Sequence, residues 1–196
     1  RDPFTREHSV RVADTSRAIA KRMGWSETEM SALHAAGIIH DVGRIAIPDH
    51  ILTSTTGLTE AEFDQIKAHA AIGADMAAGL MTPVQVGWIR HHHERWDGRG
   101  YPDGLFAQSI PTGALIMAVA DSWDAMISDR PFREGLSEHA ALEQIVSGSG
   151  AQYDPRVVEV FVEFFESGSP LLSRSRLPSS PQHDVTEQVP PKASGF

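Results

Sequence analysis

Helix signals recur along the chain, and signals for β-strands do not. Ser26 with Glu29 and Thr59 with Glu62 each match the capping box, in which two side chains satisfy the first backbone N–H groups of a helix. Apolar residues follow both boxes at helical spacing. The predicted helices cover approximately residues 8–24, 26–42, 59–80, 83 through the histidines at 91–93, 113–127, a short segment after 137, and 155–165. We therefore predict an all-α fold, a single-domain helical bundle.

Composition separates a folded domain from a C-terminal tail. With 196 residues and 41% hydrophobic composition, the chain can form one full-sized core. Ser, Pro and isolated charges replace the apolar periodicity after about Glu166. We predict a domain over residues 1–167 and a disordered, Ser/Pro-rich tail over residues 168–196.

Charge and cysteine content exclude several kinds of function. The chain contains no cysteine, so it cannot use thiolate nucleophiles or disulfides, and a transition-metal site must use His, Asp and Glu. A net charge of −9 argues against a nucleic-acid-binding surface. Neither an apolar window of about 18 residues nor a secretory signal is present. We expect a cytoplasmic protein that makes no membrane contact through this segment.

Three consecutive histidines end a predicted helix, and periodicity distinguishes only one of them. The apolar stripe of that helix consists of Val84, Trp88, Ile89 and Trp96. His92 lies near the centre of the stripe, so we expect it to point into the core. His91 and His93 flank it by equal angles, so periodicity allows either one as a second metal ligand. The alternative for His92 alone is a hydrogen-bonded core histidine.

His40 and Asp41 form a second candidate pair. His40 shares a stripe with Met30, Leu33 and Gly37, so we expect it to face the core. Asp41 follows at the C-terminal end of the helix, where the helix dipole disfavours a carboxylate by roughly 0.3–1 kcal/mol. A metal ion would compensate this charge, and the two carboxylate oxygens could bridge two metals. The alternative is a solvent-facing aspartate.

Three further residues are less clear from periodicity. His8 and His69 lie on or at the edge of helical stripes, and each alone is better interpreted as a core or boundary histidine than as a ligand. Asp121 lies opposite the main apolar face of its helix, so periodicity predicts a solvated side chain. The neighbours on its own side are apolar and leave room for a second packed face: Ala114, Met117, Ala118 and Ala125.

Four motifs, in this order, closely resemble the HD-GYP family. They are IIHDVGRIAIPDHIL, IKAHAAIGADM, HHERWDGRGYPDGL and VADSWDAMISDRPFREGL, and the resemblance runs from Asp2 to about Glu166. It implies an HD-superfamily helical bundle and a metal-dependent phosphodiesterase that hydrolyses the bacterial second messenger cyclic di-GMP. Members usually form the output domain of a larger signalling protein. We therefore expect an N-terminal sensory or receiver domain in the full-length protein, and a homodimer stays open.

The resemblance also implies a two-metal centre. The ligands of one metal would be His8, His40, Asp41 and Asp121, and those of the other Asp41, His69, His92 and His93. Asp41 would bridge the two ions. The family motif reads His-His-Glu, and Glu94 follows His93 here, so the resemblance selects His93 rather than His91. Iron or manganese is expected for these ligands, and zinc, nickel and magnesium would also fit.

Further residues are matched to roles in catalysis and substrate binding. Asp41 and Arg44 are the implied catalytic residues. The implied substrate-binding residues are Gly100, Tyr101, Pro102, Asp124, Arg130 and Arg133. In this set the Gly-Tyr-Pro loop shapes the site, and the two arginines engage the substrate phosphates through their planar guanidinium groups.

The chain departs from the family pattern at three positions. Arg44 stands where the family usually has Lys, which keeps the charge but changes the shape and makes binding a firmer expectation than turnover. Phe4 occupies the position of the Glu found in members with a third metal, so we expect two metals. Phe132 replaces the more usual Tyr and removes one hydroxyl.

These matches imply a specific reaction and leave two rivals. A metal-bridging hydroxide would attack phosphorus and produce linear pGpG, with GMP as the product of a second cleavage. The first rival is a cyclic di-GMP receptor or protein-interaction module with little or no turnover. The second is an HD-type phosphohydrolase that acts on another nucleotide.

Overall fold

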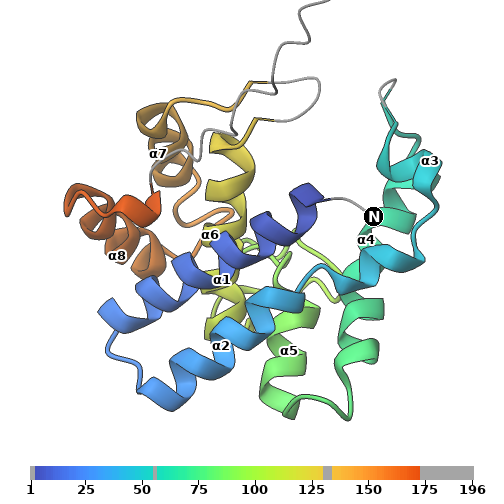
Figure 1. Cartoon of the computed structure of the whole chain (residues 1–196), viewed down its shortest axis with the longest axis horizontal. Helices are drawn as coiled ribbons and strands as arrows, with labels where there is room; N and C mark the ends of the chain where they lie inside the picture. The colour runs from blue at the N-terminus through green and yellow to red at the C-terminus, as the bar shows by residue number, and fades with distance from the viewer. Residues whose placement is uncertain (1–2, 55–56, 130–133, 173–196) are drawn as a thin grey trace, which may run out of the picture.

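The computed structural model describes residues 3–54, 57–129 and 134–172, with the side chains described from residue 6 onward, and these residues fold into a bundle of α-helices without a named strand (Figure 1). The α-helices are α1 Pro3–Arg22, α2 Glu27–Ile39, α3 Asp49–Leu52, α4 Glu60–Ala77, α5 Pro83–His91, α6 Thr112–Ile127, α7 Glu138–Ser147 and α8 Pro155–Glu166. Short 3₁₀ helices are η1 Val42–Ala46, η2 Ala107–Ser109 and η3 Pro170–Leu172. The predicted all-α class is confirmed. No described helix is long and apolar enough to cross a membrane.

Helix α6 forms the centre of the bundle and is buried on nearly all sides. It contacts α1, α5, α7 and α8, and its Trp123 packs edge to face against Phe161 of α8 with ring centroids 5.1 Å apart (Figure 1). Aromatic pairs in this geometry add to the stability that burial provides. Because α6 has packed neighbours around its circumference, a polar residue such as Asp121 can lie on it without facing open solvent.

Capping residues define where the predicted helices begin. The Ser26 backbone N–H donates to Glu29 at 2.9 Å and the Glu29 N–H donates to Ser26 Oγ at 3.3 Å, as the capping box predicts. The box at the start of α4 is also formed. A third box, Thr82 with Gln85, starts α5 together with Pro83 at the first turn.

A close approach between η1 and α4 brings two parts of the chain together near their functional residues. A Cβ atom on Gly43 would overlap the carbonyl oxygen of His69 and would lie 2.6 Å from the backbone nitrogen of Gly73. Real Cβ atoms essentially never come within 3.0 Å of a neighbour. Only glycine fits here, and its small size sets the distance between Asp41 and His69.

Several predicted boundaries differ from the structure. Helix α2 ends at Ile39 rather than near Val42, and a 3₁₀ turn follows. Helix α4 ends at Ala77, not Leu80, and the four-residue α3 was not predicted. Leu172, which lies beyond the predicted domain boundary at residue 167, is buried. The rest of the predicted tail, residues 173–196, lies outside the described residues.

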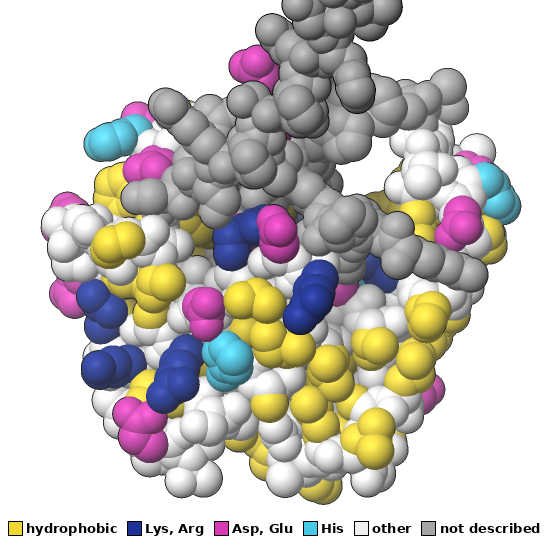
Figure 2. All heavy atoms as spheres, viewed as in Figure 1, with side chains coloured by type: hydrophobic (Ala, Val, Ile, Leu, Met, Phe, Trp, Pro, Cys, Tyr) yellow, Lys and Arg dark blue, Asp and Glu magenta, His cyan; other side chains and the backbone are white. Residues whose placement is uncertain are grey.

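The outer surface shows where the apolar stripes are incompletely covered. In the face drawn in Figure 2, hydrophobic side chains gather over the region where α2, α4 and α5 lie in Figure 1. These helices carry partly exposed apolar side chains, among them Ile38, Met76 and Val84. Val84 was predicted to belong to the buried stripe of α5 and is 60% exposed because it lies in the first turn, away from the core.

Candidate metal centre

Three buried histidines are held in the same way by their own helices. In each of His40, His69 and His92, ring atom Nδ1 lies within hydrogen-bond distance of a backbone carbonyl three residues earlier. The acceptors are Gly37 O for His40 at 2.7 Å, Ile66 O for His69 at 2.5 Å and Ile89 O for His92 at 2.6 Å. A carbonyl oxygen can only accept, so Nδ1 carries the hydrogen and Nε2 of the neutral ring keeps its lone pair. This orientation is typical of histidines that bind metals through Nε2.

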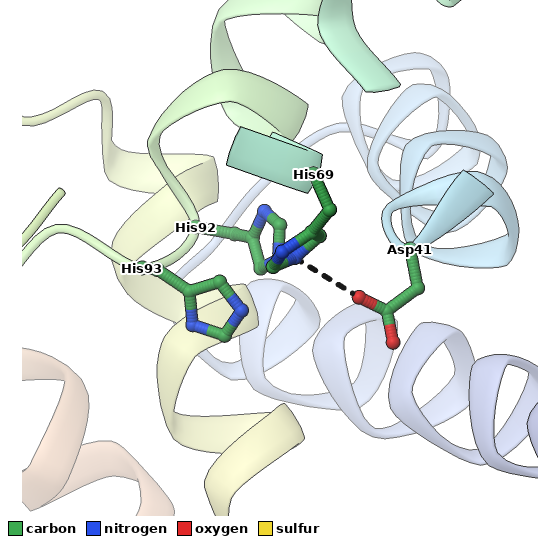
Figure 3. A group of neighbouring side chains, drawn as sticks. All are labelled: Asp41, His69, His92 and His93. Atoms are coloured by element: carbon green, nitrogen blue, oxygen red, sulfur yellow. Dashed lines mark ion pairs between the residues drawn. The ribbon is translucent and has the colours of Figure 1, made fainter. Parts of the chain in front are cut away.

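The Nε2 atoms of these three histidines, the Nε2 atom of His93 and the carboxylate of Asp41 lie close together. In Figure 3, His69, His92 and His93 lie together opposite the Asp41 carboxylate. The Nε2 atoms of the four histidines and Asp41 Oδ1 are buried and have no hydrogen-bond partner among the described residues. Buried acceptors without donors are costly, and they fit a cation placed between them. One ligand atom from each of Asp41, His69, His92 and His93 lies within 4.8 Å of the others.

Asp41 lies between two groups of histidines. Its Oδ1 is 3.2 Å from His69 Nε2, and its Oδ2 is 3.7 Å from His40 Nε2 and 4.0 Å from His8 Nε2. Burial opposes ionisation of this carboxyl, but the contacts with His40 and His69 and the charge of Arg44 outweigh burial and hold the pKa of Asp41 well below its usual range. An ionised carboxylate with one oxygen toward each group has the position required of a bridging ligand.

A second group forms around His8, on α1. Ligand atoms of His8, His40 and Asp41 lie within 4.8 Å of one another. Asp121 Oδ1 is 3.2 Å from His8 Nε2 and 4.0 Å from His40 Nε2, outside that tighter group but next to it. The Asp121 side chain is 15% exposed, so the periodicity prediction of a solvated residue is wrong and the second packed face exists. Helix α1, which brings His8 next to Asp121, packs against α6 and covers this face.

His8 differs from His92 and His93 in how readily it takes up a proton. Burial lowers the pKa of His93 to about 4 and that of His92 well below its usual range, and neighbouring histidines add to both shifts. For His8, burial opposes the charged form, but hydrogen bonds and charges from Asp121 and Asp124 raise the pKa to about 9. Without metal, the His92 and His93 rings are therefore neutral at pH 7, while His8 carries a proton.

A buried glutamate hydrogen-bonds the backbone that follows Gly-Tyr-Pro and holds this loop beside the centre. Glu94 is 1% exposed and accepts the backbone N–H groups of Asp103 at 2.7 Å and Leu105 at 3.1 Å. A Cβ on Gly100 would overlap the backbone of Glu94, so the loop can pass this closely only with glycine. The Tyr101 ring lies 4.9 Å from the His93 ring at 32°, and the Tyr101–Pro102 peptide bond is cis. The loop therefore covers one side of the centre.

Comparison with known proteins assigns this arrangement to a family. A model of the HD domain family matches residues 1–157. The chain belongs to the HD-domain family. Relatives of this HD-domain chain include a cyclic di-GMP phosphodiesterase of Thermotoga maritima, 43% identical over 83% of this chain and 45% of the relative. The cyclic di-GMP phosphodiesterase response regulator RpfG of Xanthomonas campestris is 39% identical over 83% of this chain and 44% of its own length.

A third relative and two solved structures extend the comparison. The 3'3'-cGAMP-specific phosphodiesterase 2 of Vibrio cholerae is 30% identical over 83% of this chain and 32% of its own length. The chain thus spans less than half the length of these relatives. Bd1817, an HDG"Y"P protein from Bdellovibrio bacteriovorus, has a TM-score of 0.68 at 19% identity, covering 83% of this chain and 52% of that chain. The V. cholerae phosphodiesterase V-cGAP3 has a TM-score of 0.64 at 22% identity, over 85% and 45%. These two structures support the HD-domain fold alone.

The HD-domain structure separates the three consecutive histidines. Helix α5 ends at His91, His92 is its C-cap, and the chain then turns so that His93 joins the cluster. His91 faces away, with Nδ1 2.8 Å from Gly87 O and Nε2 2.9 Å from Asp103. The choice between His91 and His93 thus depends on where the helix ends, which equal angles about a continuous helix cannot show.

Apart from Asp41 and the Gly-Tyr-Pro loop, the predicted catalytic and substrate residues lie in different positions relative to the centre. Arg44 is 42% exposed, with Nε 2.9 Å from Asp41 Oδ1, so it lies at the centre and reaches the surface. Asp124 is 3% exposed and is bonded to His8 and Arg11 below the centre, which does not favour its predicted contact with substrate. Arg130, Phe132, Arg133 and the side chain of Phe4 lie outside the described residues, and their roles stay predictions.

Two residues near the centre were missed by the sequence analysis. Glu94 appeared there only as a letter that fixed the register of the motif, although it holds the loop. Arg11 was not considered, although it lies three residues after His8, one helical turn along the same face. Asp124 stands in the same relation to Asp121. Residues one turn from a candidate ligand were the available signal.

Proposed function

We propose that this HD-domain chain hydrolyses cyclic di-GMP to linear pGpG, with GMP after a second cleavage, by means of two divalent metal ions. The observation that carries the proposal is a set of five buried atoms that have no hydrogen-bond partner among the described residues and lie in two groups sharing Asp41: Nε2 of His40, His69, His92 and His93, and Oδ1 of Asp41. Relatives 43% and 39% identical over this region are cyclic di-GMP phosphodiesterases. Because the chain spans under half of each, the activity of the complete protein is part of the proposal.

The proposed ligands divide between two ions that share Asp41. One ion would be held by His8, His40, Asp41 and Asp121, and the other by Asp41, His69, His92 and His93. Imidazole nitrogen and carboxylate oxygen suit iron or manganese. When bound, two such ions supply Lewis acidity toward the phosphoryl oxygens and lower the pKa of water.

The chain's own residues bind and orient the substrate around this centre. A cyclic dinucleotide is a dianion, and the chain has a net charge of −9, so positive charge must be provided locally. Arg44 is held by its ion pair with Asp41 and still reaches the surface, so its guanidinium can contact a phosphoryl oxygen. Tyr101, stacked near His93, limits access of water on the loop side. Arg130 and Arg133 are proposed as further phosphate ligands.

A second candidate substrate is supported by one comparison. A relative 30% identical over 83% of this chain is a 3'3'-cGAMP-specific phosphodiesterase. The metal centre by itself recognises a phosphodiester and not a base, so it is equally suited to both cyclic dinucleotides. Discrimination must come from residues that contact the bases.

The decisive experiment is a product assay with defined metal. The protein is loaded anaerobically with Fe(II) or Mn(II), and cyclic di-GMP and 3'3'-cGAMP are each supplied. We expect chromatography to show pGpG or GMP from cyclic di-GMP, and no product from the His40→Ala, Asp41→Ala double variant. Binding of metal and cyclic di-GMP without product would instead identify a receptor. Faster cleavage of 3'3'-cGAMP would move the assignment to the second substrate.

A further inference from the structure

His8 is oriented by a side chain, whereas the three buried histidines described above are oriented by backbone carbonyls of their own helices. Its Nδ1 lies 2.7 Å from Asp124 Oδ2, an atom on α6 and 116 residues away in the chain. The carboxylate accepts, so His8 Nδ1 donates and Nε2 is directed toward Asp121 and Asp41. The geometry of His8 therefore depends on how firmly Asp124 is held.

Asp124 is held by a bidentate ion pair with Arg11. Arg11 Nε donates to Asp124 Oδ1 at 2.5 Å and Arg11 Nη2 donates to Oδ2 at 3.0 Å. Ser128 Oγ adds a longer contact to Oδ2 at 3.4 Å. Paired guanidinium and carboxylate groups fix both position and angle, and the positive charge of Arg11 compensates the buried negative charge of Asp124.

These contacts leave Asp124 no free capacity for a substrate. Its two oxygens already accept from His8, Arg11 and Ser128, and the residue is 3% exposed. Arg11 and His8 lie one helical turn apart on α1, so the same pair of oxygens joins both residues to α6. A hydrogen-bonded carboxylate behind a histidine ligand fixes the ring and its tautomer.

We propose that Asp124, clamped by Arg11, is a positioning residue that orients His8 and so sets the affinity of one half of the centre, the half formed by His8, His40 and Asp121. The inference rests on the proposed two-metal function and deepens it, because it makes the two ions unequal. The half formed by His69, His92 and His93 does not contain His8, and two of its histidines are braced by backbone. Loss of the clamp affects the His8 half selectively.

Two variants test the clamp from its two sides. In Asp124→Asn the shape is kept, but one oxygen becomes an NH₂ donor that must face either the N–H of His8 or that of Arg11. If it faces His8, the ring can relieve the conflict only by moving its hydrogen to Nε2, where a metal would bind. Arg11→Gln removes the paired guanidinium hydrogen bonds and leaves Asp124 held only by His8 and Ser128.

Matched controls are available on the same helix. Asp14 is 3.0 Å from His34, an aspartate–histidine pair on the surface and away from the centre, so Asp14→Asn repeats the chemical change without touching it. Arg17 pairs with Glu27 at 2.8 Å at the surface, so Arg17→Gln controls for loss of an arginine on α1.

The measurement is binding of Mn(II) alone to the metal-free chain, by calorimetry and by electron paramagnetic resonance. We expect two ions per chain in the parent protein and a spectrum of two coupled ions. Asp124→Asn should weaken binding of the ion in the His8 half about 10–100-fold, as is typical when a residue that hydrogen-bonds a metal ligand is replaced. The affinity for the ion in the half formed by His69, His92 and His93 should stay within about twofold of the parent. At metal concentrations that saturate the parent, this variant should show a single-ion spectrum. Arg11→Gln should act in the same direction, and the double variant should be no weaker than Asp124→Asn.

Other outcomes overturn the inference in distinguishable ways. If the affinity for the ion in the His8 half stays within twofold of the parent in both variants, His8 needs no clamp. Equal weakening of both ions, together with a lower melting temperature, would show that the Arg11–Asp124 pair only joins α1 to α6. Binding of a single ion by the parent protein would overturn the proposed two-metal function itself, and the clamp with it.

Discussion

Replacing Gly43 by Ala should disturb both the fold and the metal centre. The added Cβ would overlap the carbonyl oxygen of His69 and lie 2.6 Å from the nitrogen of Gly73, and both are backbone atoms of α4 that cannot rotate away. Overpacking of this kind typically costs about 1–3 kcal/mol, and we expect the upper end here. For a chain of this size, that corresponds to a melting temperature lower by roughly 6–12 °C.

The same displacement should weaken metal binding, because η1 starts next to Asp41 and would move away from His69. Gly87→Ala is the matched control: no atom lies within 4 Å of its added Cβ, and it lies within α5. Alanine there should stabilise by about 0.5–1 kcal/mol. Thermal melts by circular dichroism and Mn(II) titration check both variants. A Gly43→Ala protein that melts within about 1 °C of the parent would refute the argument from the close approach.

Three further predictions concern the centre itself. Removing metal with a chelator should lower the melting temperature by roughly 5–11 °C per site, because an ion at about 100 times its Kd stabilises by about 2.7 kcal/mol; an unchanged melt would argue against bound metal. His93→Ala should reduce cyclic di-GMP hydrolysis by more than the ~10–100-fold typical of outer partners, whereas His91→Ala should stay close to the parent in the same chromatographic assay. In metal-free protein, the His8 pKa of about 9 lies above its ordinary value of 6.5, so its stabilising contribution is complete below pH 6.5 and is lost as pH rises through 9. The pKa of His93, about 4, is shifted in the opposite direction, below the ordinary value of 6.5. Its stabilising contribution is therefore lost as pH falls from 6.5 to 4. Urea unfolding across this range checks both limbs, and His8→Gln should abolish the alkaline one.

Local sequence patterns predicted most of the helices correctly because their signals are local. The Ser26–Glu29 and Thr59–Glu62 boxes require only residues three positions apart, and both form as expected. The end of α5 was harder to predict, because the chain leaves the helix at His91 to place His93 beside His69 and Asp41. The turn is stabilised by a tertiary contact, so the apolar periodicity within the helix cannot predict it.

The burial of Asp121 also could not be predicted from the pattern of its own helix. Its helix has one obvious apolar face, and the residue lies on the other, so a solvated side chain was the direct reading of the pattern. Packing of α1 against α6 brings His8 to 3.2 Å from Asp121 and makes that face interior. A pattern within one helix cannot indicate which other helix will cover it.

The sequence by itself determined the helical class, the starts of α2, α4 and α5, and the residue types from which a centre could be built. Without cysteine, a transition-metal site had to use imidazole and carboxylate, and the order of the motifs pointed to one family. Only the tertiary structure showed that Asp121 is covered by α1, and that Asp124, held by Arg11, supports His8. The contacts of Asp124 join atoms more than 100 residues apart in the chain within 3 Å, and such distances are set by the packing of whole helices.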